Sequence, residues 1–323
     1  MTRYDFLTFG ENMIRLSTRN YERLEQAQTV DIRHGGTESN TAMGLVRLGL
    51  SAAWVSRLVN NALGQKIAGE LSQWGVDTSH VVWTNDGRMG TFFLEVGSPP
   101  RPSSVLYDRR DSSMSRMTVA DFPWSLLSES RWLHATGITT GISESCRELA
   151  GEAMRRGRAA GLFVSYDVNY RARLWSTDQA RAGMSPLCSD ADIMFVTQAD
   201  AARVFGVQGS SAEDTIRTLA GAFARKAVVM TMGAQGAMAF DKESVALYRS
   251  PGYLVPQTID RIGAGDAFDA GFIAGYLEEG IEKGLAFGNA MAALKMTIHG
   301  DFPFVSRAEV ETLVAGGTAG INR

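Results

Sequence analysis

Residues 260–268 read Asp-Arg-Ile-Gly-Ala-Gly-Asp-Ala-Phe and lead into an apolar segment, 267–277, that predicts a helix. Glycines let the backbone approach a ligand closely, and the unpaired N–H groups of a helix N-terminus suit a phosphate. Asp266 falls in the first turn, where the helix dipole keeps a carboxylate ionised and able to accept a proton from a hydroxyl. Gly263, Ala264, Gly265 and Asp266 are therefore candidates for an anion hole and its catalytic base. The alternative is a glycine-rich turn whose aspartate only caps the helix.

Other phosphate-binding and metal-binding motifs are absent from the sequence. Phe268 stands where a dinucleotide-binding fingerprint needs its third glycine, which disfavours NAD. No lysine follows a glycine, so a Walker A loop cannot be written. The histidines are scattered and no Cys/His zinc spacing occurs, so we expect no zinc site.

Two more segments carry polar groups next to predicted elements. Residues 35–40, Gly-Gly-Thr-Glu-Ser-Asn, run into a helix, so their N–H groups and the Asn40 amide suit the hydroxyls of a polar substrate. The alternative is an ordinary helix cap at Ser39 or Asn40. Residues 167–171, Asp-Val-Asn-Tyr-Arg, follow a predicted strand, where open α/β sheets bind ligands. Arg171 suits a phosphate or a carboxylate, although a single arginine there is also a common surface residue.

Short apolar runs alternate with helical segments along most of the chain. The runs are residues 4–10, 52–58, 131–136, 162–167, 192–197 and 226–232, and they predict buried parallel strands. Helices are predicted over 39–48 and 63–74, each ending at a glycine. This alternation predicts an α/β fold, a doubly wound and mostly parallel sheet with helices on both faces.

Residues 12–34 and 88–112 break this alternation. They lack helical periodicity and alternate like exposed antiparallel strands, with Pro99-Pro100 at a predicted hairpin tip. We expect them to form a small inserted β lid, leaving residues 1–11, 35–87 and 113–323 as the core that binds nucleotide and substrate. An exposed lid also offers edges and an apolar face that a second subunit of a homo-oligomer could cover.

Composition favours a small-molecule role. The chain has 323 residues, and 32 Lys and Arg against 35 Asp and Glu give a formal charge of −3, so no broad basic surface for nucleic acid is expected. The longest uncharged stretch, residues 227–240, is shorter than the roughly 18 residues of a membrane span. The N-terminus has no signal-peptide pattern, and Cys146 and Cys188 are the only cysteines. We expect a cytoplasmic protein.

Together, residues 35–40 and 263–266 resemble the N-terminal and C-terminal signatures of the ribokinase-type PfkB family of carbohydrate kinases. The similarity runs over nearly the whole chain. It implies a ribokinase-like α/β core with a β lid, ATP and Mg²⁺ as co-substrates, and Asp266 as the base.

Within that family the chain looks most like 2-keto-3-deoxygluconate kinases. The similarity is carried by residues 167–171 with Leu174-Trp175 and by Tyr107-Asp108-Arg109 in the lid. The resemblance implies that the sugar acid is surrounded by Gly36, Thr37, Glu38, Ser39, Asn40, Phe93, Tyr107, Arg109, Arg171, Asp266 and Asp301. It implies that the nucleotide lies along Asn169, Arg171, Thr231, Gly233, Gly236, Gly263, Ala264, Gly265 and Asn289.

An acid substrate also follows from charge. A carboxylate can be matched in geometry and charge by Arg109 and Arg171, whereas a neutral sugar needs no fixed cation. Arg109 alone also suits a solvated position on an exposed lid strand.

Some positions depart from the family pattern. Phe93 replaces a frequent tyrosine, and Asp108 a frequent aromatic residue, so contacts of the lid with the sugar differ. Residues 197–200, Thr-Gln-Ala-Asp, replace a segment that organises Mg²⁺ through water, a role that Asp200 can take.

The sequence therefore predicts ATP-dependent phosphorylation of the terminal hydroxyl of a sugar acid, 2-keto-3-deoxygluconate, to its 6-phosphate. A PfkB-family kinase for fructose, another ketose or a nucleoside is the first alternative. A non-catalytic sugar or nucleotide sensor on the same fold is the second, and the intact Asp266 argues against it.

Overall fold

The computed structural model describes residues 2–317, and its largest element is an eight-stranded sheet. Neighbouring strands are, in order, β14 (Ala246–Ser250), β13 (Ala237–Asp241), β12 (Ala227–Thr231), β11 (Ile193–Thr197), β10 (Phe163–Asp167), β9 (Trp132–Thr136), β1 (Phe6–Phe9) and β4 (Ala52–Val55). From β12 to β4 every pair is parallel. β13 and β14 add antiparallel strands at one edge.

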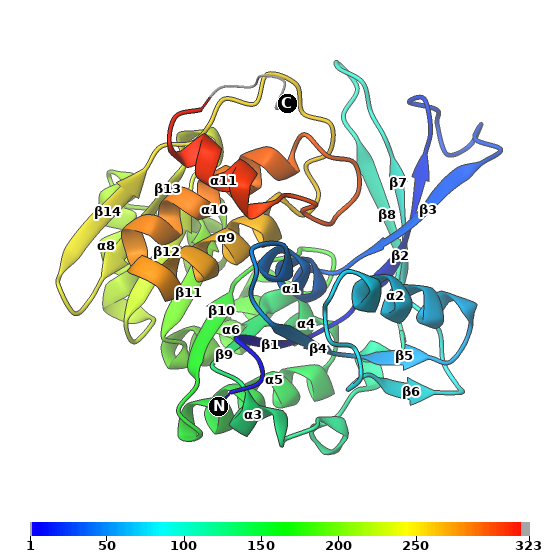
Figure 1. The fold of residues 1–323 in the computed structure, drawn as a ribbon, viewed down its shortest axis with the longest axis horizontal. Helices are drawn as coiled ribbons and strands as arrows, with labels where there is room; N and C mark the ends of the chain where they lie inside the picture. Colours follow the sequence, from blue (N-terminus) through cyan, green and yellow to red (C-terminus); the bar gives the residue numbers. More distant parts are fainter. Residues whose placement is uncertain (1, 318–323) are drawn as a thin grey trace.

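Helices cover both faces of this sheet (Figure 1). One face carries α5 (Glu144–Ala159), α6 (Thr177–Asp190), α7 (Gln198–Phe205) and α8 (Ala212–Ala222). The other face carries α1 (Thr37–Arg47), α2 (Ala62–Gln73), α9 (Ala264–Glu279), α10 (Ile281–Lys295) and α11 (Arg307–Val314). Strand side chains alternate between the two cores, as where Leu7 and Phe9 join the first core and Phe6 the second. Short helices α3 (Leu126–Glu129) and α4 (Gly137–Ile142) complete the layers.

The predicted doubly wound α/β fold is confirmed, with corrections in detail. Residues 52–58 are two strands: β5 (Arg57–Val59) leaves the main sheet and pairs with β6 (Val82–Thr84). Strands β13 and β14 were not predicted, since their short runs sit among turn residues. α9 starts at Ala264, earlier than the predicted residue 267, so Gly265 and Asp266 lie inside its first turn.

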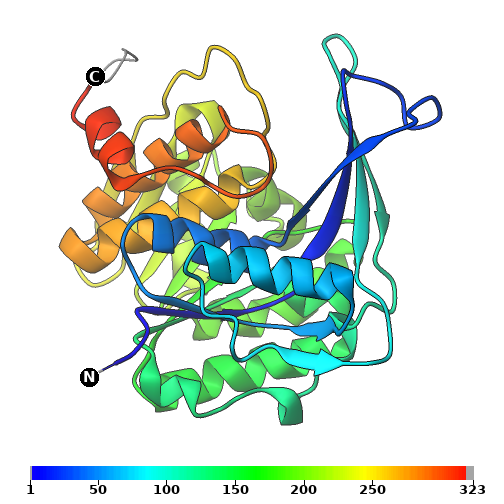
Figure 2. The same cartoon turned by 45° about the vertical axis from the view of Figure 1, so that its right-hand side comes forward.

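A second, four-stranded sheet extends from one side of the α/β body (Figure 2). Its strands, in order, are β3 (Val30–Gly35), β2 (Met13–Thr18), β7 (Thr91–Glu95) and β8 (Ser104–Asp108), all within the two segments predicted for the lid or at their boundary. β2–β3 and β7–β8 are antiparallel hairpins, and Pro99-Pro100 lies in the tip of the second. β2 and β7 are parallel, which corrects the purely antiparallel expectation. The reason is that each is the first strand of its hairpin, so both run in the same direction, away from the α/β body (Figure 2).

The outer face of this small sheet is apolar at its free end. Leu16 pairs with Ile32 and with Phe93, and Phe93 pairs with Leu106, so these side chains form one row across the four strands. Ile32 is 54% exposed and Leu106 is 56% exposed. Coverage of this face by a second subunit stays a prediction, as does the division of the chain into core and lid. No helix of residues 2–317 is long and apolar enough to span a membrane.

Candidate active site

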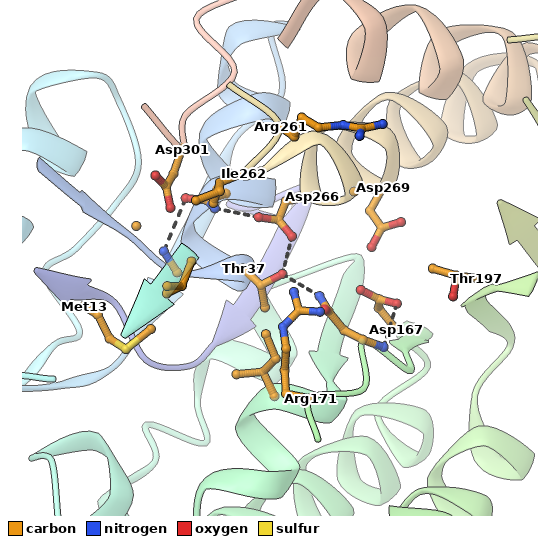
Figure 3. A pocket seen from close by; sticks show the side chains of 18 of the residues that line it. Met13, Thr37, Asp167, Arg171, Thr197, Arg261, Ile262, Asp266, Asp269 and Asp301 are labelled. Carbon is orange, nitrogen blue, oxygen red and sulfur yellow. Dashed lines mark hydrogen bonds between the residues drawn. The ribbon is translucent and has the colours of Figure 1, made fainter. Parts of the chain in front are cut away.

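Asp266 lies at the bottom of a cavity of about 340 Å³ between the main sheet, α9 and the small sheet (Figure 3). Thr37 Oγ1 donates a hydrogen bond to Asp266 Oδ1, and Asn40 Nδ2 donates to Asp266 Oδ2 at 2.6 Å. Burial raises the pKa of Asp266, and the hydrogen bonds from Thr37 and Asn40 oppose that rise. The Asp266 side chain is thus fixed at both oxygens, and its proton affinity is higher than that of a free aspartate. Such a group suits a general base.

Within residues 36–40, the helical period decides which side chains face the cavity and which point away from it. Thr37 and Asn40, three residues apart on α1, face α9 together and hold Asp266, and Gly36 lines the cavity. The Asn40 amide, expected on substrate hydroxyls, is therefore used on the base. Glu38 and Ser39 point away from the cavity: Ser39 Oγ binds the Gly36 carbonyl at 2.8 Å and accepts from Asn12.

Glu38 is fully buried beneath α1, although it was predicted to touch the substrate. Its Oε1 accepts hydrogen bonds from Thr136 Oγ1 and Thr139 Oγ1, both at 2.6 Å. Burial raises the pKa of Glu38 to about 7. In this structure it is a core residue behind the site.

The glycines that precede the base differ in what they do. Gly263 caps α9 with φ of 85°, and a Cβ there would lie 2.1 Å from the Asp301 carbonyl oxygen, so only glycine fits. At Gly265 a Cβ would meet no protein atom within 4 Å, because this residue faces open cavity. The Ala264 N–H, the first of α9, donates to the Arg261 carbonyl at 3.2 Å, whereas the next residue, Gly265, faces the open cavity. An anion hole over the segment 263–265 stays a prediction.

Other carboxylates surround the same cavity, from the ends of neighbouring strands and from α9. Asp167 ends β10, Asp200 lies in the first turn of α7 after β11, and Asp269 follows Asp266 by one turn (Figure 3). Burial raises the pKa of the Asp167 carboxyl and of the Asp269 carboxyl, and the nearby Asp167 adds to the rise at Asp269. Asp269 was missed, although its i+3 spacing from Asp266 was a usable signal.

The small sheet provides the outer wall of the cavity through Met13, Phe92, Val105 and Tyr107. Phe92 stands directly opposite Tyr107, with ring centroids 6.0 Å apart. Phe93, predicted at the sugar, points to the outer face because consecutive side chains of a strand alternate. The prediction was one residue out of register, and Phe92 holds the position by the cavity.

The two arginines that were expected to bind an acid have different surroundings. Arg109 lines the cavity, but its guanidinium forms an ion pair with Glu11, whose side chain is only 2% exposed. Among residues 2–317 no carboxylate lies within ion-pair distance of Arg171, which also lines the cavity and donates only to the Tyr170 carbonyl. Asn169, expected along the nucleotide, donates from Nδ2 to Thr37 Oγ1 at 2.9 Å and so supports the contact with Asp266.

A second cavity, of about 530 Å³, adjoins the first on the far side of the α9 N-terminus. Thr231, Arg261 and Gly265 line both cavities. The second is bordered by the residues predicted for the nucleotide, Gly233, Gly236, Ala264 and Asn289, and by the apolar side chains of Tyr253, Leu254, Phe268 and Met296. The predicted site residues therefore separate into two adjoining spaces that meet at the anion hole.

Asp301 reaches the first cavity, but its carboxylate is engaged by another residue. Arg15, on β2, forms ion pairs with Asp301 and with Asp260. Burial raises the pKa of Asp301 to about 6, and Arg15 opposes the rise. Neither Arg15 nor Glu11 was predicted, because their partners lie far away in the sequence and no local pattern marks them.

A buried carboxylate in one cavity, next in sequence to a glycine that lines a second cavity as well, fits transfer of a phosphoryl group from a donor in one cavity to a hydroxyl in the other. Residues 5–304 match the family model described as pfkB family carbohydrate kinase. The chain belongs to this family. Its fold is accordingly ribokinase-like, and it is a carbohydrate kinase.

Relatives within the PfkB family act on keto-deoxy sugar acids, according to their names. A 2-dehydro-3-deoxygalactonokinase from Haloferax volcanii is 38% identical over 320 residues, covering 99% of each chain. A 2-dehydro-3-deoxygluconokinase from Bacillus subtilis is 31% identical, covering 92% of this chain and 91% of the relative. The crystal structure of 2-dehydro-3-deoxygluconokinase from Thermotoga maritima matches with a TM-score of 0.88 and 33% identity, over 96% of this chain and 99% of that one.

Proposed function

We propose that this PfkB-family kinase transfers phosphate from ATP to the terminal hydroxyl of 2-keto-3-deoxygluconate, giving ADP and the 6-phosphate. The observation that carries the proposal is the Asp266 carboxylate, which Thr37 and Asn40 hold in the first cavity, next to Gly265, a residue that lines both cavities. The names of the relatives support a keto-deoxy sugar acid as the acceptor.

In this mechanism Asp266 accepts the proton of the substrate hydroxyl at a carboxylate oxygen. Thr37 and Asn40 hold that carboxylate, so little reorganisation is needed as the proton moves. The N–H groups at Gly263 and Gly265 face the phosphoryl group and stabilise the charge that develops on it, whereas the Ala264 N–H donates to the Arg261 carbonyl at 3.2 Å. The small sheet walls the substrate cavity through Tyr107 and Phe92 and limits its access to water.

The donor set also fits Mg²⁺, which accompanies ATP and neutralises phosphate charge. Asp167, Asp200 and Asp269 line the first cavity with the oxygen ligands that Mg²⁺ prefers. In residues 2–317 no three His, Cys, Asp or Glu side chains are grouped to hold a metal directly. Asp200 would therefore act through water, as the sequence predicted.

Recognition of the acid falls chiefly to Arg171. Its guanidinium has no ion-pair partner among the described residues, so it can meet a substrate carboxylate without first giving up an ion pair. Arg109 is already neutralised by Glu11, and we assign it to hydrogen bonding of the sugar acid beside Tyr107. The sequence predicted that both arginines pair with the substrate carboxylate, and we now assign this charge contact to Arg171 alone.

The test is a coupled ADP-release assay with 2-keto-3-deoxygluconate, its C4 epimer 2-keto-3-deoxygalactonate, and fructose. We expect the gluconate to have the highest kcat/KM. The galactonate is the second candidate because the Haloferax volcanii relative bears that name. A preference for fructose would replace the proposal with a ketose kinase, and absence of turnover with any sugar would favour a sensor.

Arg171→Met adds a test of the acid contact. A charge-assisted hydrogen bond contributes about 1.5–3 kcal/mol, so kcat/KM for the sugar acid should fall roughly tenfold to a hundredfold. Turnover of a neutral ketose should change far less. Arg110→Met is the matched control, since Arg110 is exposed and lies outside both cavities. An equal loss with both substrates would contradict the assignment.

A further inference from the structure

Arg15 is a buried cation on the small sheet that none of the steps above uses. It lies on β2 and is 3% exposed, and its Nη2 is 2.5 Å from Asp260 Oδ2. Its Nη1 contacts Asp301 Oδ1, and its Nε donates to Ser17 Oγ at 2.8 Å. Every part of the guanidinium is therefore committed, and two of its contacts leave the small sheet for the α/β body.

Both residues whose carboxylates contact Arg15 also contact the backbone around the proposed anion hole. Asp260 Oδ1 accepts the Ile262 N–H and its Oδ2 accepts the Gly300 N–H, each at 3.1 Å. Asp301 packs its carbonyl against Gly263 so closely that a Cβ there would lie 2.1 Å from it. Asp260 thus holds the entry to the loop and Asp301 supports its last glycine before α9.

Lys295 completes a charge-balanced cluster at this place. It is fully buried at the end of α10, and its Nζ donates to the Asp260 carbonyl at 3.0 Å and is 3.4 Å from the Ile298 carbonyl. Arg15 and Lys295 supply two positive charges, and Asp260 and Asp301 supply two negative charges. Removal of Arg15 would leave buried carboxylates without their partner, which they can relieve only by moving or by taking up protons.

The cluster also joins the walls of the substrate cavity to its catalytic end. Met13, two residues before Arg15 on the same strand, lines the cavity that holds Asp266. Alternate residues of a strand share a face, so the side chain that walls the substrate and the one that holds the loop project from the same side of the sheet. A displacement of this sheet therefore changes the cavity and the loop together.

We propose that Arg15 is a positioning residue: by binding Asp260 and Asp301 from the small sheet, it keeps the N–H groups of Gly263 and Gly265 aimed at the phosphoryl group while that sheet covers the acceptor. The inference rests on the proposed function for its catalytic consequence. Its structural part, that Arg15 orders the loop, stands independently.

Arg15→Met in the full chain removes the charge and keeps much of the side-chain volume, and Arg15→Lys keeps the charge but cannot reach both carboxylates with a planar fork. Arg19→Met is the control, because Arg19 follows the same strand and pairs with Asp31 in an exposed position. The first readout is hydrogen exchange of the ligand-free chain in a peptide containing residues 260–266. Exchange there should be faster in Arg15→Met, intermediate in Arg15→Lys and unchanged in Arg19→Met.

The second readout is steady-state kinetics well below the melting temperature. Misplacement of catalytic groups by about 1 Å can cost roughly a hundredfold, so kcat of Arg15→Met should fall about tenfold to a hundredfold, with KM for ATP and for the sugar acid changing far less. Arg15→Lys should recover part of kcat.

A lower melting temperature with unchanged kcat and unchanged loop exchange would show that Arg15 serves stability alone and would overturn the proposal. If Arg15→Met does not fold, the same measurements on Arg15→Lys decide, and wild-type exchange and kcat in that variant reject the inference. If the unaltered chain phosphorylates no sugar acid, the proposed substrate fails, whereas loop exchange still decides whether Arg15 orders the loop.

Discussion

Thr37→Val should move the acid limb of the pH–rate profile. In the structure Thr37 Oγ1 donates to Asp266 Oδ1 and accepts from Asn169 Nδ2. Valine has nearly the same shape but no hydroxyl, so the substitution removes this contact and leaves the Asn40 hydrogen bond on the other carboxylate oxygen. The change therefore tests how far the base depends on its partners.

The expected size follows from the charge of the acceptor. A hydrogen bond to a charged group contributes about 1.5–3 kcal/mol, and one pKa unit corresponds to about 1.36 kcal/mol. Thr37 stabilises the ionised form of Asp266, so its loss favours the protonated form and raises the pKa of this carboxyl by roughly 1–2 units. Since only the ionised form accepts a proton, activity should disappear at a higher pH than in the unaltered chain.

The assay is kcat/KM for the sugar acid across roughly pH 4.5 to 8.5. Thr41→Val is the matched control: Thr41 lies one turn further along α1, and its hydroxyl contacts the backbone carbonyls of Thr37 and Asp266 but not the carboxylate. The midpoint of the acid limb should shift upward in Thr37→Val only. A midpoint that stays in place, in a variant that folds, would refute the role given to this hydroxyl.

Three further changes test other parts of the site. Asp266→Asn should keep ligand affinity, measured by calorimetry, and lower kcat by roughly 10²–10⁴, so near-normal turnover would exclude Asp266 as the base. Gly265→Val should lower kcat by roughly tenfold or more, because its side chain would project into the cavity without touching protein, whereas Gly69→Val in α2, also in open space, should not; equal kcat in the two variants would argue against an anion hole. Glu38, whose pKa burial raises to about 7, binds a proton in the folded state that the unfolded chain releases near pH 4.5, so stability should fall by roughly 3 kcal/mol as pH rises through that interval. Glu38→Gln should make this decline smaller in urea unfolding at pH 5 and pH 8, while the part that comes from Asp167 and Asp301 remains, and an unchanged decline would count against it.

The sequence by itself determined the fold class and marked the segment in which we propose the catalytic base. Buried parallel strands are covered on both faces, so they appear as apolar runs that need no knowledge of their neighbours, and the six predicted runs all contain strands of the main sheet. The segment 263–266 was equally legible, because glycines next to a helix start act through their own backbone. Features of this kind depend only on consecutive residues, so a sequence is enough to predict them.

The tertiary structure decided which side chains meet. Thr37 and Asp266 are 229 residues apart, and Arg15 and Asp301 are 286 apart, so neither contact leaves a local pattern. Phe92 rather than Phe93 faces the cavity because strand register sets which of two neighbouring residues points inward. The pairing of Arg109 with Glu11 likewise depends on how the small sheet docks. Charges act through space, and their partners are fixed only when the chain has folded.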